Sequence, residues 1–246
     1  MIYKIKDTNY LDKIRDLFGD IRFFMGKSVL DGMMGQAYID NPENPKIAFL
    51  TVRSYCFISG NIKKNKLKHI IDENFKEYKL IPSDSLSMII EEVYKDDIIK
   101  SYRYSLKKNP VFDILKLQHM KDCLPKDFKL IKINGHIVDK IKKEKFITIT
   151  DDYEKYGIGV CCVNKNQIVG VASSNIFYND GIEVNIKVKE EYRRKGIATA
   201  MASSLVLECL KIKKKVSWDA ANTNSVGLAE KLGFEYDSKY KIYSFK

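Results

Sequence analysis

The residues best suited to bind an anion lie in a short basic segment, residues 193–196, with the sequence Arg-Arg-Lys-Gly. Before it, apolar and polar side chains alternate over residues 182–188, which predicts a half-buried strand. After it, apolar residues recur every three or four positions over 197–212, which predicts a helix with one apolar face. The first amides of a helix have no partner within it, and the helix dipole adds partial positive charge there. We therefore predict an anion site, most simply for a pyrophosphate, where the strand joins the helix.

This segment resembles the signature of the GNAT family of N-acyltransferases, which is Arg or Gln, two residues, Gly, one residue, then Gly or Ala. Arg193, Gly196 and Ala198 meet that signature. Residues 221–234 resemble the family's later helix and its Leu-Gly-Phe exit. Within the family, the chain is similar to the branch of zwittermicin A self-resistance acetyltransferases, and residues 40–45 and 218–222 contribute to that similarity.

The resemblance implies an α+β GNAT fold, a twisted and mostly antiparallel sheet flanked by helices. Residues 126–246 would form the acetyl-CoA-binding catalytic domain. Hydrophobic periodicity predicts three successive strands in this region, over 157–163, 168–177 and 182–188. Beyond the basic segment it predicts a long helix, a short strand, a second helix and closing strands, over 197–212, 216–218, 223–232 and 234–245. This is the order of elements expected of a GNAT core.

Residues 1–125 are expected to form an additional α+β region whose chemistry the sequence does not reveal. The pattern predicts helices over 10–18, 63–73, 84–94 and 111–123. It predicts strands over 36–39, 47–52, 55–59 and 101–107, with a hairpin closed at residues 53–54. One hypothesis is that this region is a decayed second copy of the GNAT core.

The resemblance also implies which residues hold the cofactor. Backbone amides of residues 194–199 would bind the pyrophosphate, and the backbone of residues 186–188 would pair with the pantetheine arm as an extra strand would. Asn222 would bond the same arm, although an asparagine there can equally serve only as a helix cap. The implied cofactor contacts are Ile186, Lys187, Val188, Arg193, Arg194, Lys195, Gly196, Ile197, Ala198, Thr199 and Asn222.

Acyl transfer to an amine needs a group that removes a proton from the amine, and Glu183 is the candidate for this role. It lies on the polar face of the predicted strand together with Asn185 and Lys187. The alternatives are that the carboxylate anchors a cationic substrate or pairs with Lys187. Asn185, Trp218 and Asp219 could border the acceptor pocket; for Trp218 and Asp219 the alternatives are core packing and a loop cap.

Position 229 departs from the family pattern. Many GNAT enzymes have a tyrosine here that protonates the departing thiolate, whereas this chain has Ala229. Alanine cannot donate a proton. The alternatives are another donor, such as Tyr236, Tyr240 or Tyr243, or protonation of the thiolate by water.

Composition narrows the class of partner. The chain has 246 residues and a net charge of +11, from 43 basic and 32 acidic side chains. A nucleic-acid-binding surface is one interpretation of this charge, and solvated basic faces are the other. The sequence favours solvated faces, because it has no long basic block and no interleaving of aromatic and basic residues. We therefore expect no nucleic-acid partner, although a positive field would help to attract a polyanionic cofactor.

Cysteine usage and hydropathy bear on location. The five cysteines form no C-x-x-C pair and the three histidines are dispersed, so we expect free thiols, no metal site and a reducing, cytoplasmic compartment. No apolar run approaches the ~20 residues that span a bilayer, and the start of the chain lacks the apolar region of a signal peptide. We expect no membrane partner.

Together these observations predict an acetyl-CoA-dependent N-acetyltransferase that transfers the acetyl group directly to a primary amine. The acceptor is expected to be a small molecule, and an antibiotic-like amine is one such acceptor. Two other interpretations stay open. One is a protein or peptide N-acetyltransferase, and the other is a catalytically silent CoA-binding or sensor protein, which Ala229 keeps in play.

Overall fold

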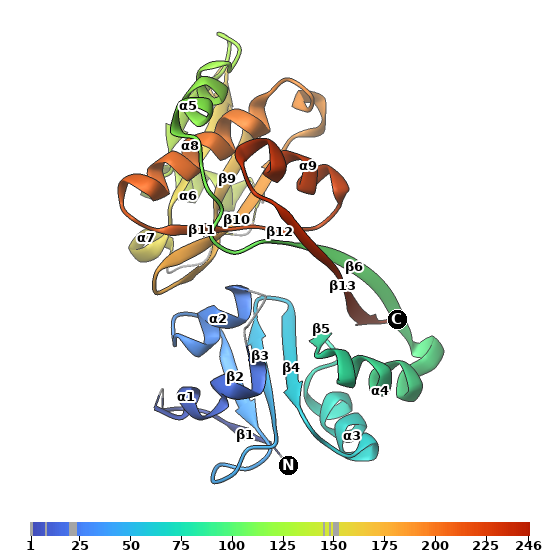
Figure 1. Ribbon diagram of the computed structural model, residues 1–246. Helices are drawn as coiled ribbons and strands as arrows, with labels where there is room; N and C mark the ends of the chain where they lie inside the picture. The colour runs from blue at the N-terminus through green and yellow to red at the C-terminus, as the bar shows by residue number, and fades with distance from the viewer. Residues whose placement is uncertain (1, 8, 20–23, 145, 148, 150–152) are drawn as a thin grey trace. The chain divides into compact units, whose positions relative to one another are not determined.

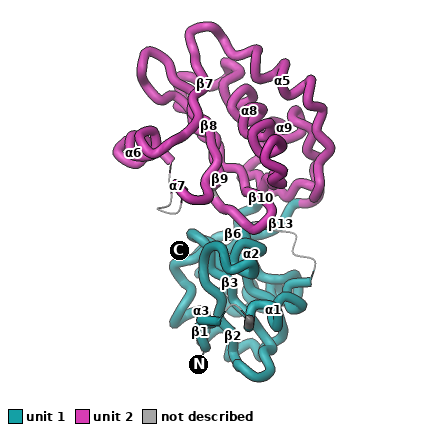
Figure 2. The backbone as a smooth tube through the Cα atoms, turned by 90° about the vertical axis from the view of Figure 1, so that its left-hand side faces the viewer, with its two compact units in different colours: residues 1–103, 239–246 teal, residues 104–238 magenta. Residues whose placement is uncertain are grey.

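The computed structural model describes residues 2–7, 9–19, 24–144, 146–147, 149 and 153–246 (Figure 1). The chain divides into two compact units, shown in Figure 2. Unit 1 comprises residues 1–103 and 239–246, and unit 2 comprises residues 104–238. Strands β6 (Ile98–Leu106) and β13 (Tyr236–Phe245) contribute residues to both units. The domain boundary predicted near residue 125 lies inside unit 2, and as a functional division it stays a prediction.

Unit 2 is built on a five-stranded sheet with the strand order β11-β10-β9-β8-β7. Its strands are β7 (Lys129–Lys132), β8 (Gly159–Asn164), β9 (Gln167–Tyr178), β10 (Gly181–Val188) and β11 (Lys215–Ser217). All neighbours are antiparallel except β10 and β11, which are parallel. The helices are α5 (Ile114–Asp122), α6 (Gly135–Lys143), α7 (Tyr153–Tyr156), α8 (Ile197–Lys211) and α9 (Thr223–Leu232). The predicted succession of three antiparallel strands, helix, strand, helix and strand is confirmed.

Two helices cover opposite faces of this sheet. Cys161 and Cys162 are adjacent on β8, so their side chains point to opposite faces. Cys161 belongs to a buried cluster with Val138 and Ile141 of α6. On the other face, a side chain added at Gly170, which pairs with Cys162, would collide with Met201 of α8 at 2.6 Å. The sheet is therefore sandwiched between α6 and α8, which fixes the position of the α8 N-terminus relative to β10.

Unit 1 contains a second sheet, in which β1 to β5 follow one another in order and β13 pairs with β5. Its strands are β1 (Tyr3–Lys4), β2 (Gln36–Ile39), β3 (Ile47–Val52), β4 (Tyr55–Gly60) and β5 (Lys79–Pro82). Its helices are α1 (Asn9–Arg15), α2 (Phe24–Leu30), α3 (Lys64–Asn74) and α4 (Asp84–Tyr94), with short 3-10 turns at Asp16–Phe18 and Lys95–Asp97. Among β1 to β5 and β13, neighbouring strands are antiparallel except for one pair, β4 and β5.

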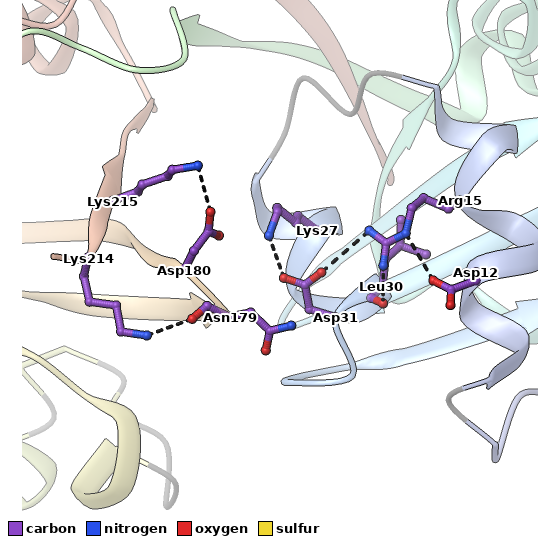
Figure 3. Close-up of polar contacts among 9 residues, drawn as sticks. All are labelled: Asp12, Arg15, Lys27, Leu30, Asp31, Asn179, Asp180, Lys214 and Lys215. Atoms are coloured by element: carbon purple, nitrogen blue, oxygen red, sulfur yellow. Dashed lines mark hydrogen bonds and ion pairs between the residues drawn. The ribbon is translucent and has the colours of Figure 1, made fainter.

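Ion pairs link the two N-terminal helices of unit 1 (Figure 3). Asp31 lies 2.7 Å from the ammonium of Lys27 and 3.6 Å from the guanidinium of Arg15. Arg15 also donates to the carbonyl of Leu30 at 3.0 Å. The guanidinium of α1 thus binds the end of α2, and the two helices are held together by groups that satisfy the α2 C-terminus.

The sequence predicted most of these elements but not all of them. The hairpin between β3 and β4 is confirmed, and Arg53 supplies the positive φ (56°) that its turn needs. Among the described helices and strands, six were not predicted, namely β1, α2, β5, β7, α7 and β12 (Asp219–Ala220). More than one closing strand was expected over 234–245; this prediction was wrong, because the segment forms one continuous strand, β13.

The two units repeat one order of elements. In each, two helices precede a three-stranded antiparallel meander, which is followed by a helix, a strand parallel to the third strand, and another helix. The two units differ in the connection between the third strand of the meander and the helix that follows it. In unit 1 only residues 61–63 join β4 to α3, whereas in unit 2 residues 189–196 join β10 to α8. This order supports the hypothesis of a second core in the N-terminal region, without the long basic connection.

Three further expectations concern the cysteines, membrane-spanning helices and metal sites. All five cysteines are free thiols, four of them buried and Cys123 exposed. Within the described ranges, no helix is long and apolar enough to cross a membrane. The same residues contain no group of His, Cys, Asp or Glu side chains that could hold a metal ion.

Candidate active site

The basic connection of unit 2 ends in a left-handed glycine at the start of α8. Gly196 is the N-cap residue, with φ 75° and ψ −5°. An added Cβ at Gly196 would meet nothing within 4 Å, so glycine is required by the backbone conformation and not by packing. The space in front of this backbone is open. A ligand can therefore approach the start of the helix closely.

The first turn of α8 combines open amides with positive charge. The amide of Ala200 donates to the carbonyl of Gly196 at 3.0 Å, so the amides of residues 197–199 precede the first hydrogen bond of the helix. Ile197 is buried and anchors the turn, whereas the three cationic residues before Gly196 are exposed. Lys195 lies 5.3 Å from the ring centroid of Tyr192. The segment predicted to bind an anion therefore has main-chain donors with exposed cationic side chains beside them, and Arg193 also contacts Glu190 and the Val188 carbonyl.

Strands β10 and β11 separate after a short pairing. They are in register at Gly181–Lys215, Ile182–Val216 and Glu183–Ser217. The chain then turns, and β12 (Asp219–Ala220) pairs with residues 104–105 of β6 instead. Among the described strands, residues 184–188 of β10 therefore have no partner on this edge. Their main-chain groups can bind an extended ligand by strand addition, as expected for residues 186–188.

A β-bulge lies at the same point. The register between β10 and β9 shifts between Glu183 and Val184, where Glu183 pairs with Ile176 and Val184 with Ser174. One extra residue of β9 is accommodated there. Bulges bend a strand and increase its twist. The bulge and the separation from β11 together place Glu183 at the head of the open edge.

The Glu183 carboxylate is buried, with 5% of the residue exposed, and both its oxygens accept hydrogen bonds. Ser217 Oγ donates to one oxygen at 2.5 Å, and the amide of Asp219 donates to the other at 2.5 Å. Both donors come from the chain segment that turns away from β10. The carboxylate therefore joins the two strands where they diverge.

Tyr178 completes this buried group. Its side chain is buried, and burial raises the pKa of Tyr178, with the Glu183 carboxylate raising it further. The phenol is therefore neutral at physiological pH. Gly181 makes room for it, because a side chain there would lie 2.5 Å from both the Tyr178 hydroxyl and the Lys215 carbonyl.

The turn between β9 and β10 is tied to the start of β11 (Figure 3). Asp180 pairs with Lys215 at 2.8 Å, and the ammonium of Lys214 donates to the carbonyl of Asn179 at 2.8 Å. These contacts hold β10 and β11 together at the end where they pair. The two strands consequently separate only beyond Glu183.

The remaining predicted acceptor residues lie in different surroundings. Asp219 is brought directly beside Glu183 through its amide. Trp218 is buried; its Nε1–H donates to Ser225 Oγ at 3.0 Å and its ring packs edge-on against Phe234. Asn185 is half-buried on β10, farther along the open edge. Trp218 therefore has the core contacts that were its alternative interpretation.

Lys187 and Asn222 also have structural partners. The exposed Lys187 ammonium lies 5.5 Å from the ring centroid of Phe146. Asn222 is the N-cap of α9, and its side-chain oxygen accepts from the amide of Ser225 at 3.0 Å. The amide nitrogen of the Asn222 side chain is not used in that cap. The expected contact with a pantetheine arm is thus compatible with capping.

Residue 229 cannot protonate a departing thiolate, because it is an alanine. Ala229 is completely buried in α9. Among the alternative tyrosines, Tyr243 belongs to unit 1, where its hydroxyl donates to Glu91 at 2.7 Å. Tyr236 is 43% exposed on β13.

Sequence reasoning missed Ser217, Tyr178 and Gly181. The available signal was weak, since a serine in a short strand and a tyrosine before a turn have many structural uses. Only the register of β10 with β11 puts Ser217 opposite Glu183.

Unit 1 contains a cavity of about 540 Å³ at the carboxyl ends of β4 and β5. Its walls include Phe57, Pro82 and Met88, with Asp84 and Lys239 among the charged lining residues. Tyr240, one of the alternative proton donors, lines this cavity, whereas none of the residues predicted to contact the cofactor or the acceptor does.

Comparisons with known proteins agree with this geometry. A family model described as GNAT acetyltransferase matches residues 15–243. A crystal structure of a GCN5-related N-acetyltransferase-like protein from Streptococcus suis 89/1591 is 32% identical, with a TM-score of 0.86, over 97% of this chain and 99% of that chain. YdfB from Bacillus subtilis (strain 168), described as an uncharacterized N-acetyltransferase, is 26% identical over 234 residues, 88% of each chain.

One further match concerns the fold alone. A tandem GNAT protein from the clavulanic acid biosynthesis pathway covers 99% of this chain, with a TM-score of 0.54 and 8% identity. The family match over most of the chain, with the Streptococcus suis relative, establishes that this chain belongs to the GNAT acetyltransferase family and is an acyltransferase.

Proposed function

We propose that the protein is an acetyl-CoA-dependent N-acetyltransferase that acts on the primary amine of a small molecule by direct transfer. The observation that carries the proposal is the open edge of β10, residues 184–188, which leads directly to the left-handed Gly196 and the first turn of α8. The pantetheine arm of acetyl-CoA would pair with the open strand edge, and its pyrophosphate would bind at the start of the helix. These two features follow one another along the chain.

Acetyl-CoA would supply the acetyl thioester. In this proposal its pyrophosphate binds the amides of residues 194–199, with Arg193, Arg194 and Lys195 contributing positive charge. The open space at Gly196 fits this group, because a Cβ added there would meet no atom within 4 Å. Main-chain groups of residues 186–188 and the side-chain amide of Asn222 hold the arm.

Glu183 receives the proton of the acceptor amine or anchors its ammonium form. Its burial supports both roles, because a carboxylate with little water around it interacts strongly with a nearby cation. Asp219, Asn185 and Trp218 would border the acceptor. Two neighbouring carboxylates would favour a cationic small molecule, and the resemblance to zwittermicin A self-resistance enzymes makes an antibiotic-like amine a specific case. Free thiols support a reducing, cytoplasmic setting.

A second candidate is a CoA-binding protein that does not transfer the acetyl group. The buried Ala229 favours it, because the chain offers no phenol at the position where many relatives carry one. In the enzymatic reading, water protonates the thiolate. The two candidates differ in turnover and not in cofactor binding.

A transfer assay separates them. Purified protein is incubated with acetyl-CoA and a panel of primary amines, including glucosamine and putrescine, and thiol release is followed. We expect amine-dependent release that falls at least tenfold in Glu183→Gln, since a positioned base contributes on the order of a hundredfold or more. Acetyl-CoA binding without thiol release for any amine would refute the enzymatic proposal in favour of the silent one.

A further inference from the structure

Ser217 lies opposite Glu183 in the short parallel pairing of β10 and β11, and both residues are about 95% buried. Ser217 Oγ is 2.5 Å from Glu183 Oε2 and 2.9 Å from the carbonyl of Ile182. A hydroxyl has one proton, and the shorter contact with the charged acceptor identifies where that proton is directed. The serine therefore donates to the carboxylate.

The second oxygen is fixed independently. Glu183 Oε1 accepts from the amide of Asp219 at 2.5 Å. Two donors on two different oxygens determine both the position and the plane of a carboxylate, whereas one donor leaves it free to rotate. Since the Asp219 amide belongs to the main chain, Ser217 is the side chain that sets the plane.

A buried aromatic side chain lies beside this pair. Burial raises the pKa of Tyr178 of β9, and the Glu183 carboxylate raises it further, so the phenol next to the carboxylate is neutral. Gly181 has no side chain where one would collide with the Tyr178 hydroxyl.

We propose that Ser217 is a positioning residue that acts through Glu183, directing the carboxylate toward the amine at the open edge of β10. This inference rests on the function proposed above and deepens it. The alternative is a buried serine that only satisfies its own hydroxyl by bonding to Ile182. The two differ in whether removing the hydroxyl affects the transfer step while leaving cofactor binding intact.

The test compares Ser217→Ala, Ser217→Thr and Ser203→Ala. Ser203 is a matched control, because it is fully buried in α8 and its hydroxyl has no hydrogen-bond partner within the part of the chain that the structure describes. For each variant, kcat and the KM of an amine that the panel identifies are measured. Calorimetry gives the Kd of acetyl-CoA, and thermal unfolding gives the midpoint.

We expect Ser217→Ala to lower kcat by about ten- to a hundredfold, because a small misorientation of a reacting group has effects of this size. The Kd of acetyl-CoA should stay within about twofold, since the lost interaction serves transfer and not uniform binding. Ser217→Thr, which keeps the hydroxyl, should recover most of kcat, and Ser203→Ala should match the wild type.

Wild-type kcat in Ser217→Ala would overturn the inference. So would a loss of kcat matched by an equal loss of acetyl-CoA affinity and not restored by threonine, which would indicate a structural serine. If the wild type binds acetyl-CoA but transfers to no amine of the panel, the proposed function fails first, and the positioning role falls with it.

Discussion

Replacing Gly196 by glutamate tests the anion site through a single position. Two effects are expected. The left-handed backbone (φ 75°) costs about 1 kcal/mol for a residue with a Cβ. The new carboxylate also faces the two negative charges of a pyrophosphate. At about 6 Å in water each repulsion is about 0.7 kcal/mol, so the pair amounts to about 1.4 kcal/mol.

The matched control is Gly196→Ala, which introduces the same backbone strain without the charge. Because 1.4 kcal/mol is a factor of ten, we expect Gly196→Glu to bind acetyl-CoA about tenfold more weakly than Gly196→Ala. The affinities are measured by calorimetry at low and high salt. Raising the ionic strength should reduce the difference, since it is electrostatic and the site is exposed.

The reasoning is refuted if the two variants bind acetyl-CoA equally at low salt. It is also refuted if their difference does not respond to salt. In either case the first turn of α8 would not be where the pyrophosphate lies.

Two further predictions concern stability. Hydrogen bonds from Lys100, Lys241 and Tyr243 lower the pKa of Glu91 to about 2. Because the pKa of Glu91 is lower in the folded protein, its ionised form stabilises the fold at pH values above the ordinary carboxyl pKa of about 4.5, and this contribution is lost as pH falls toward 2. Discounted for partial exposure, the contribution to the free energy of unfolding is about 1–2 kcal/mol. Urea unfolding should show Glu91→Gln to be less stable by this amount at pH 7 and equal to the wild type near pH 2, and an unchanged difference at both would contradict it. Gly181→Ala should lower stability by about 1–3 kcal/mol in the same assay because its Cβ overlaps main chain, and a neutral effect would argue against the close packing of Tyr178.

Local periodicity predicted the elements that carry their own signal. The bounds of β2, β3 and α9 agree with the prediction at both ends. In α9 the signal is doubled, because Asn222 caps its start and Gly233 takes the left-handed conformation at its end. Such elements are defined by residues that are close in the chain.

Elements that depend on partners distant in sequence were not predictable. Strand β5 has only residues 79–82 and includes a proline; it is a strand because β4 pairs with it along its length. Residues 239–245 of β13 belong to unit 1, although more than a hundred residues separate them from the rest of that unit. The residues next to a strand in the sequence do not indicate which distant strand it pairs with.

The candidate site shows the same division. The basic loop was predicted from Arg193, Gly196 and Ala198, since the motif is contiguous. The buried contact between Glu183 and Ser217 was not predicted, because it depends on a register between strands that are separated by the whole of α8. The sequence indicated the carboxylate but not what holds it.

The central claim is that unit 2 binds acetyl-CoA along β10 and at the start of α8. Unit 1 repeats the order of elements, but the N-cap of its α3 is the extended Lys63 where α8 has a left-handed glycine, and its connection is short. Titration of the wild-type protein with acetyl-CoA by calorimetry tests the claim most directly. The account predicts saturable binding of one acetyl-CoA per chain, weakened by Gly196→Glu. An absence of binding, or binding that Gly196→Glu leaves unchanged, would contradict it.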